Sequence, residues 1–210
     1  MSTTSADALA RLWSERGFDI DDDAVVALDQ HRLFGRIAPL VVEIGSGMGD
    51  ATIAMAATDP GRDYLAIDVH TPGLGNLLAQ AEALDLTNVR AARGDAVELL
   101  RHGIDSGALD AIHVFFPDPW PKARHHKRRI IDPDRVALMR DRLRVGGVLH
   151  TATDWPDYAE QMLEVLTAEG GLRNLHDGFA PRGERPVTKY ERRGTNAGRP
   201  IHDCVFARSS

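Results

Sequence analysis

Short apolar runs alternate with helix-like stretches from residue 40 onward, and this alternation constrains the fold more than any other feature of the chain. The predicted strands lie at Leu40–Ile44, Tyr64–Asp68, Val89–Ala92, Ala111–Phe115 and Val148–Thr151. The predicted helices lie between and after them, at Asp50–Ala57, Leu74–Leu84, Ala96–Arg101, Pro133–Asp141 and Trp155–Ala168. Such alternation is typical of βαβ units. We therefore expect an α/β fold with a mostly parallel central sheet and helices on both faces.

The two ends of the chain follow other patterns. Residues 6–16 have helical apolar spacing, and an acidic turn at Asp19–Asp23 is expected to start a second short helix through Val25, Val26 and Leu28. Residues 1–35 are thus predicted to form a helical extension, and residues 36–210 a single domain. A strand near Leu172–Leu175, a long connection rich in Gly, Pro and Arg, and a final antiparallel strand at Asp203–Ala207 are expected to close the fold.

Composition limits the possible partners and the compartment. The chain has 210 residues and a net charge of -6, so any nucleic-acid contact must come from local clusters of basic residues. Two such clusters occur, at Lys122–Arg129 and Arg182–Arg199. The single Cys204 excludes an internal disulfide and a multi-cysteine zinc site, and no metal is expected. The sequence has no signal peptide or membrane-spanning stretch, which predicts a cytoplasmic protein.

The run FFPDPWPKARHHKRR, residues 115–129, joins a possible chemical site to a possible polyanion site. Asp118 follows an apolar strand and stands between two prolines, and a dense block of positive charge comes directly after it. Pro-Asp-Pro can also be an ordinary turn, and a basic run can be plain solvated surface. Trp120 and the pair His125-His126 among the charges favour base stacking and RNA contact.

A glycine-rich turn and three carboxylates predict a nucleotide-like cofactor site. Gly45 and Gly47 follow the first strand, where glycine lets the backbone approach a ligand closely. Asp68 ends the second strand and can accept from ribose hydroxyls, although it could also be a strand terminator. Asp95 follows the third strand and can accept from an adenine amine or cap a helix. Glu43, inside an apolar strand, can hold a cationic ligand group or only brace the glycine turn.

Together these features resemble the class I S-adenosylmethionine-dependent methyltransferases, which have a Rossmann-like fold. The run at residues 115–130, Ala152-Thr153-Asp154-Trp155 and the segment TKYERRG at residues 188–194 look like the bacterial tRNA (guanine-N7)-methyltransferases. The resemblance covers the chain from about Trp13 onward. It implies transfer of a methyl group from S-adenosylmethionine to guanine N7 in tRNA, at guanine 46 of the variable loop.

The resemblance also implies roles for individual residues. The cofactor would be bound by the glycine turn and by Glu43, Asp68, Asp95 and Asp118, and Asp118 would be catalytic. The substrate would be contacted by Lys122, Asp154, Thr188, Lys189, Tyr190 and Glu191. RNA would meet the stretch made of Arg124, His125, His126, Lys127, Arg128 and Arg129. No obligatory protein partner is expected, and a monomer and a homodimer both remain open.

Departures from the family pattern bear on affinity. The family more often has Glu where this chain has Asp68, often has Phe where it has Tyr190, and commonly carries a basic N-terminal arm that residues 1–7 lack.

Three alternative functions remain open. A Rossmann oxidoreductase would not explain the basic block after Asp118. A small-molecule methyltransferase would not need it, and a noncatalytic RNA-binding module would not need the carboxylates.

Overall fold

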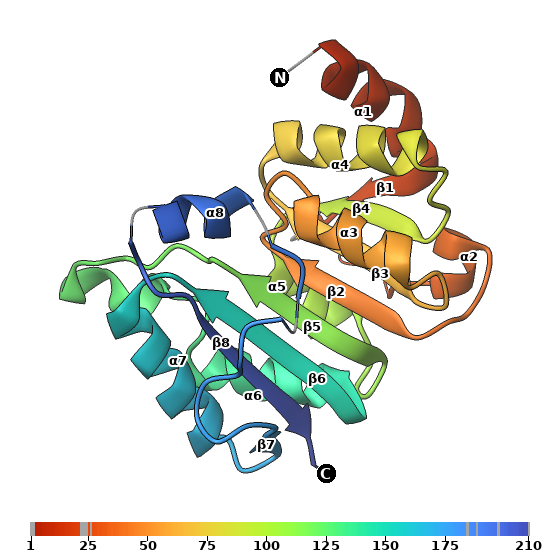
Figure 1. The fold of residues 1–210 in the computed structure, drawn as a ribbon. Helices are drawn as coiled ribbons and strands as arrows, with labels where there is room; N and C mark the ends of the chain where they lie inside the picture. The colour runs from red at the N-terminus through yellow and green to blue at the C-terminus, as the bar shows by residue number, and fades with distance from the viewer. Residues whose placement is uncertain are drawn as a thin grey trace. The chain divides into compact units, whose positions relative to one another are not determined.

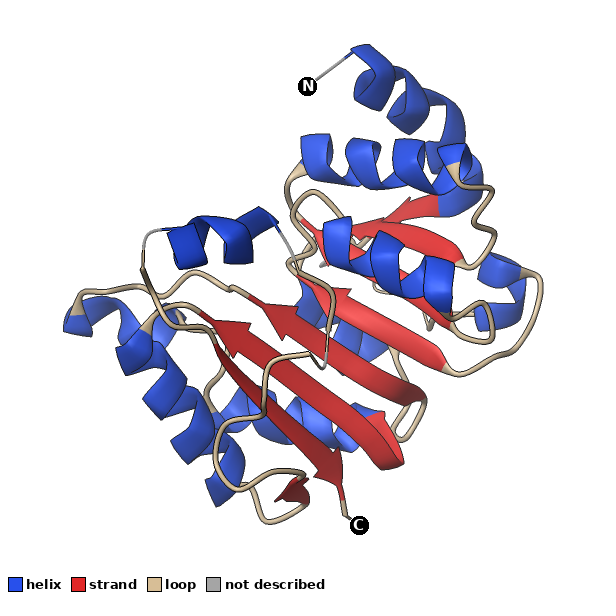
Figure 2. Cartoon of the chain, viewed as in Figure 1, coloured by secondary structure: helices blue, strands red, loops and turns tan. Residues whose placement is uncertain are grey.

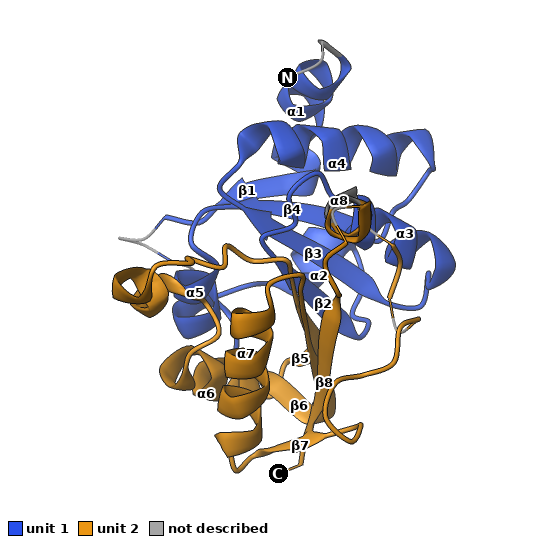
Figure 3. Cartoon of the chain, turned by 60° about the vertical axis from the view of Figure 1, so that its left-hand side comes forward, with its two compact units in different colours: residues 1–105 blue, residues 106–210 orange. Residues whose placement is uncertain are grey.

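The structure is a computed structural model that describes residues 3–21, 25, 27–183, 185–187, 189–196 and 198–209. The chain divides into two compact units, Met1–Asp105 and Ser106–Ser210 (Figure 3). Each unit combines helices with strands, as Figure 2 shows by colour. In the part of the chain described here, no helix is both long enough and apolar enough to cross a membrane.

The strands of the first unit pair in parallel. In spatial order they are β1 (Gly17–Asp19), β4 (Val89–Arg93), β3 (Asp63–Asp68) and β2 (Leu40–Ile44). All of β2 is buried, as expected for a strand covered on both faces. The register pairs Ile44 with Ile67 and Asp68 with Arg93, so β2, β3 and β4 end at the same edge.

The helices of the first unit are α1 (Thr3–Arg16), α2 (Gln30–Phe34), α3 (Asp50–Thr58), α4 (Thr71–Ala83) and α5 (Ala96–Glu98), which continues into a π-helical turn, η1 (Leu99–Gly103). Helix α1 packs against α4 (Figure 1), and Arg11 of α1 pairs with Glu82 of α4 at 2.6 Å. Leu74, Leu77 and Leu78 are fully buried on α4, which packs on β3 and β4. The N-terminal segment is therefore built into the core of this unit.

The second unit has both parallel and antiparallel pairing. Its strands lie in the order β5 (Leu109–Phe115), β6 (Leu143–Thr153), β8 (His202–Arg208) and β7 (Leu172–Asn174). Strands β5 and β6 are parallel, whereas β8 runs antiparallel to β6 and to β7. The helices are η2, a 3-10 helix (Ala123–Arg128), α6 (Pro133–Arg142), α7 (Pro156–Ala168) and α8 (Lys189–Asn196). Helices α6 and α7 pack on β6 and on each other.

The predicted fold class is confirmed, with mostly parallel strands and a C-terminal antiparallel strand. Three elements differ from expectation. Gly17–Asp19 forms β1 because its backbone pairs with the edge of β4. The described residues among 25–28 form no helix, and α2 starts later because Asp29 accepts a hydrogen bond from the Arg32 amide at 2.9 Å. Helix α8 lies in the segment expected to be an irregular connection.

Candidate functional site

The glycine turn after β2 is fixed by a carboxylate. Gly45 and Gly47 have φ of 73° and 56°, a left-handed backbone that glycine adopts without strain. Asp68 Oδ2 accepts from the Gly47 amide at 2.6 Å, and Asp68 Oδ1 accepts from the His70 amide at 2.7 Å. A Cβ on Gly73 of α4 would lie 1.8 Å from the Gly47 carbonyl oxygen, so the turn rests directly on that helix. The turn is therefore held in one shape.

Glu43 and Asp95 each have a structural contact. Glu43 is 5% exposed and accepts a short hydrogen bond from Thr52 Oγ1 of α3. Asp95 is exposed, and its Oδ1 accepts from the Val97 amide at 2.7 Å as the N-cap of α5. The capping reading of Asp95 is thus confirmed, and Thr52 is a partner that the sequence did not reveal. Glu43 lies within β2, Asp68 ends β3, and Asp95 follows β4. These three strands are adjacent in the sheet.

Asp118 lies in a strained loop after β5. Phe116 and Trp120 both have left-handed φ, 53° and 45°, which is uncommon for residues other than glycine. The Phe116 amide donates to the Ala152 carbonyl of β6 at 2.7 Å, and Asp118 is exposed between its two prolines. Strained backbone persists only where the surroundings enforce it, and such positions cluster at functional sites.

A buried ion-pair network lies against the base of this loop. The Arg185 guanidinium stacks on the rings of Phe115 and Phe116, at 5.1 and 4.9 Å from their centroids. Arg185 also donates to Asp203 at 2.6 Å and to Glu191 at 2.8 Å. Arg185 belongs to the Arg182–Arg199 cluster, one of the two basic clusters from which nucleic-acid contact is expected, but its side chain is buried and bonded within the protein. Glu191, predicted to bind substrate, is held by the same arginine.

Because of this network, the free energy of unfolding should depend on pH. Burial opposes ionisation of Asp203, but a hydrogen bond from His150 and the charge of Arg185 outweigh burial, and the pKa of Asp203 lies below its usual value of 3.8. A lowered pKa in the folded state stabilises the fold above the unfolded pKa, and this contribution is lost as pH falls through the folded value. Asp203→Asn should cost about 3 kcal/mol at pH 7, because the buried Arg185 loses one of its two charged partners and keeps only Glu191.

Urea unfolding of wild type and Asp203→Asn between about pH 3 and pH 7 measures this contribution. The difference in unfolding free energy should shrink as pH falls below the ordinary range of an aspartate. A difference that stays constant across that range would show that the charge of Asp203 does not contribute.

The basic run forms the 3-10 helix η2, and its members differ in exposure. Arg124, Lys127 and Arg128 are exposed, and His125 and His126 are half-buried. Arg128 stacks over the Trp120 ring at 4.9 Å, and His125 meets the edge of that ring at 5.9 Å between centroids. The proposed stacking of Trp120 on a base therefore competes with contacts inside the protein.

Arg129 departs from the expectation of RNA contact. Its side chain is 1% exposed, and its guanidinium is hydrogen-bonded to Pro119, Asp157 and Gln161. A phosphate cannot reach a guanidinium that is enclosed in this way. We therefore restrict the candidate phosphate contacts of this run to Lys122 and residues 124–128, all of which are exposed or half-buried.

Asp154, another predicted substrate residue, lies beside α8. Asp154 follows β6 and pairs with Arg199 at 3.0 Å. A Cβ on Gly194 of α8 would lie 2.9 Å from Asp154 Oδ2, so helix and carboxylate are in contact. Thr188 lies outside the described residues, and the side chains of Lys189 and Tyr190 are likewise not described.

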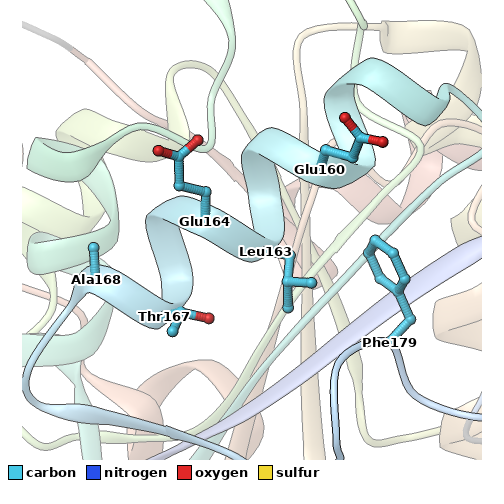
Figure 4. Close-up of a pocket in the computed structure, with 6 residues that line it drawn as sticks. All are labelled: Glu160, Leu163, Glu164, Thr167, Ala168 and Phe179. Carbon is cyan, nitrogen blue, oxygen red and sulfur yellow. The ribbon is translucent and has the colours of Figure 1, made fainter.

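A hollow on the second unit is a poor candidate for the site. It lies between α7 and Phe179 and is lined by Glu160, Leu163, Glu164, Thr167, Ala168 and Phe179 (Figure 4). Two carboxylates at its rim would repel a polyanion, and none of the predicted site residues lines it.

Comparison with known proteins identifies the family. Residues 37–204 match a family model described as "Putative methyltransferase". A tRNA (guanine-N(7)-)-methyltransferase of Streptomyces avermitilis is 53% identical over 206 residues, which are 97% of this chain and 70% of that protein. One from Nitrosospira multiformis is 54% identical over 180 residues, which are 85% and 79% of the two chains. The chain belongs to the tRNA (guanine-N7)-methyltransferase family. The resemblance of its motifs to that family is thereby confirmed, and the chain is an enzyme of this kind.

Solved structures support the fold of this methyltransferase. The 16S rRNA methyltransferase KamB superposes with a TM-score of 0.65 at 17% identity, over 89% of this chain and 99% of that chain. TrmN from Thermus thermophilus gives 0.57 at 20% identity, over 99% and 50%. At such identities the likeness shows the fold alone, which is that of the class I methyltransferases.

Proposed function

We propose that the protein transfers the methyl group of S-adenosylmethionine to N7 of guanine 46 in the variable loop of tRNA. The observation that carries this proposal is the exposed Asp118 in a strained loop that leads directly into the basic helix η2. Identity of 50–54% to proteins named tRNA (guanine-N(7)-)-methyltransferase supports the same activity.

The residues of the first unit fit this cofactor. Around the position where Gly45 would carry a Cβ, no heavy atom beyond its chain neighbours lies within 4 Å, so a ligand can approach the backbone there. The Asp68 carboxylate uses each oxygen once on a backbone amide, and each oxygen keeps a second acceptor position for a ribose hydroxyl. Glu43 and Asp95 would hold the amino acid end and the adenine.

When bound, S-adenosylmethionine supplies the methyl group on a positively charged sulfonium. Guanine N7 has a lone pair that faces the major groove, so no residue has to remove a proton from the nucleophile. Orientation of reactants can contribute about 7 to 11 kcal/mol to such a step. Asp118 would accept from guanine N1–H and the exocyclic amine, and its charge would offset the positive charge that methylation places on the ring.

The exposed side of η2 would hold tRNA phosphates, with Lys122 at its start. Simultaneous replacement of Lys127 and Arg128 by Gln should remove up to two phosphate contacts. The slope of log affinity against log salt should then fall by about 0.7 to 0.9 per contact. Because phosphate contacts carry no base information, different tRNAs should weaken equally.

Titration of tRNA at several salt concentrations measures this slope. Arg173→Gln, which removes an exposed cation on β7, is the matched control and should leave the slope unchanged. A double variant with the wild-type slope would mean that this face of η2 is only solvated surface.

One assay tests the proposed function as a whole. The protein is incubated with unmodified tRNA and S-adenosylmethionine, and 7-methylguanine is mapped by cleavage of the RNA at the modified base. Cleavage at guanine 46 is the expected result. Methylation elsewhere in the tRNA would revise the position, and the absence of any 7-methylguanine would overturn the proposal.

A further inference from the structure

Adjacent arginines at the end of η2 have opposite environments. Arg128 is exposed, whereas Arg129 is only 1% exposed. Both belong to the basic run that looks in sequence like one RNA-binding stretch. A guanidinium without solvent contact must find all its partners inside the protein, and the partners of Arg129 define what it holds.

The Arg129 guanidinium joins the Asp118 loop to helix α7. Its Nε donates to the Pro119 carbonyl at 2.8 Å, and Pro119 directly follows Asp118. Its Nη2 donates to Asp157 Oδ2 at 2.5 Å, and its Nη1 donates to Gln161 Oε1. Asp157 and Gln161 lie one turn apart on α7, so the two terminal nitrogens of the planar guanidinium reach both side chains. Its Nε then faces the loop.

The segment after Arg129 is hydrogen-bonded to the same helix, α7. The guanidinium lies over the Tyr158 ring at 4.6 Å from its centroid. The Tyr158 hydroxyl accepts from the Ile131 amide at 3.2 Å, and Gln161 Nε2 donates to the Ile131 carbonyl at 3.2 Å. Burial raises the pKa of Tyr158 to about 12, so the hydroxyl stays neutral. The hydrogen bond from Arg129 holds the pKa of Asp157 below its usual value, in keeping with a carboxylate that stays charged in the contact.

We propose that Arg129 is a positioning residue that fixes the Asp118 loop on α7, and that it is not a phosphate ligand. The strained backbone on either side of Asp118 needs such an external restraint, because Phe116 and Trp120 disfavour their own conformation. Pro119 has no N–H to donate, so its carbonyl is the backbone group of that residue through which the loop can be held. The catalytic part of this inference rests on the proposed methyl transfer through Asp118.

Conservative variants separate positioning from phosphate binding. Arg129→Lys keeps the charge but loses the planar set of donors, so kcat with saturating cofactor should fall by up to about 10²-fold, the cost of a misplacement of about 1 Å. In Arg129→Gln, which also removes the charge, the salt slope of tRNA binding should stay at the wild-type value. Arg128→Gln, its neighbour, should instead lower that slope by about 0.7 to 0.9.

Asp157→Asn tests the same contact from a side chain that is 61% exposed and therefore tolerant of replacement. It should lower kcat in the same direction, again with an unchanged slope. The double variant Arg129→Lys with Asp157→Asn should lose little more than Arg129→Lys alone, because both changes break one contact. Wild-type kcat in both single variants Arg129→Lys and Asp157→Asn, or a slope lowered by one contact in Arg129→Gln, would overturn the proposal.

Limited trypsin digestion gives a readout that does not depend on activity. We call the contact of Arg129 with Pro119, Asp157 and Gln161 the clamp. The segment that it holds, residues 122–129, contains trypsin sites at Lys122, Arg124, Lys127 and Arg128, and Arg129→Lys leaves their number unchanged. Release of the clamp should speed cleavage within residues 122–129 several-fold, while cleavage after Arg173 serves as the internal control. Unchanged cleavage would contradict the clamp. A wild-type protein without methyltransferase activity but with faster cleavage in the variant would overturn the proposed function and leave the clamp in place.

Discussion

Asp118→Asn should reduce methyl transfer to tRNA by about 10²- to 10³-fold, the usual loss when one preorganised electrostatic group is removed. The amide keeps the shape of the side chain but carries no charge. It can offer only one acceptor oxygen to guanine, and it cannot offset the positive charge of the methylated ring. Single-turnover rates with saturating tRNA and cofactor measure the loss directly.

Two comparisons make this test specific. Binding of S-adenosylmethionine should change little in Asp118→Asn, since a change there would indicate a mainly cofactor-binding role. Asp177→Asn removes an exposed carboxylate elsewhere in the second unit and should retain full activity. An Asp118→Asn enzyme that methylates at nearly the wild-type rate would remove this residue from the mechanism.

Asp68→Ala should weaken S-adenosylmethionine binding by about 10²- to 10⁴-fold. Two ribose hydroxyls would lose a charged acceptor, and each such hydrogen bond contributes about 1.5 to 3 kcal/mol. The Gly47 and His70 amides would also lose their partner, so the glycine turn would no longer be fixed in its binding shape. Isothermal titration with the cofactor measures the affinity.

The matched control for Asp68 is Asp59→Ala, which removes a carboxylate of the same unit from a surface pair with Arg62. It should bind the cofactor as wild type does, because exposed ion pairs contribute little. Affinity for tRNA should be nearly unaffected in both variants. Parallel losses of tRNA and cofactor affinity in Asp68→Ala would mean that the residue supports the fold instead of the cofactor pocket.

The sequence alone predicts those structural features that depend only on residues close to one another along the chain. Strands β2 to β5 are apolar runs bounded by turn residues, and the glycine turn and the Asp95 cap are local motifs. Strand β1 could not be predicted, because three residues become a strand only through pairing with β4, about 70 positions later. Helix α8 was missed because its composition is polar, and its buried contacts come from the Glu191 and Gly194 side of the helix.

The candidate site was predictable by residue type but not by environment. Arg128 and Arg129 are identical neighbours in sequence, and what separates them is decided by Asp157 and Gln161 on a distant helix. Arg185 likewise reads as part of a basic segment, although the folded chain buries it among Asp203, Glu191 and two aromatic rings. Local charge patterns therefore overestimate the phosphate-binding surface.

The left-handed backbone conformation of Phe116 and Trp120, on either side of Asp118, links the stability of the protein to its activity. Glycine at Phe116 or Trp120 would relieve about 1 to 3 kcal/mol of backbone strain at each position. It would also release the loop from the rings and guanidinium groups that aim its carboxylate. Relief of this strain would therefore come at the expense of the loop conformation that the proposed chemistry requires. Persistence of bulky aromatic residues at these two points would mark selection for turnover over robustness.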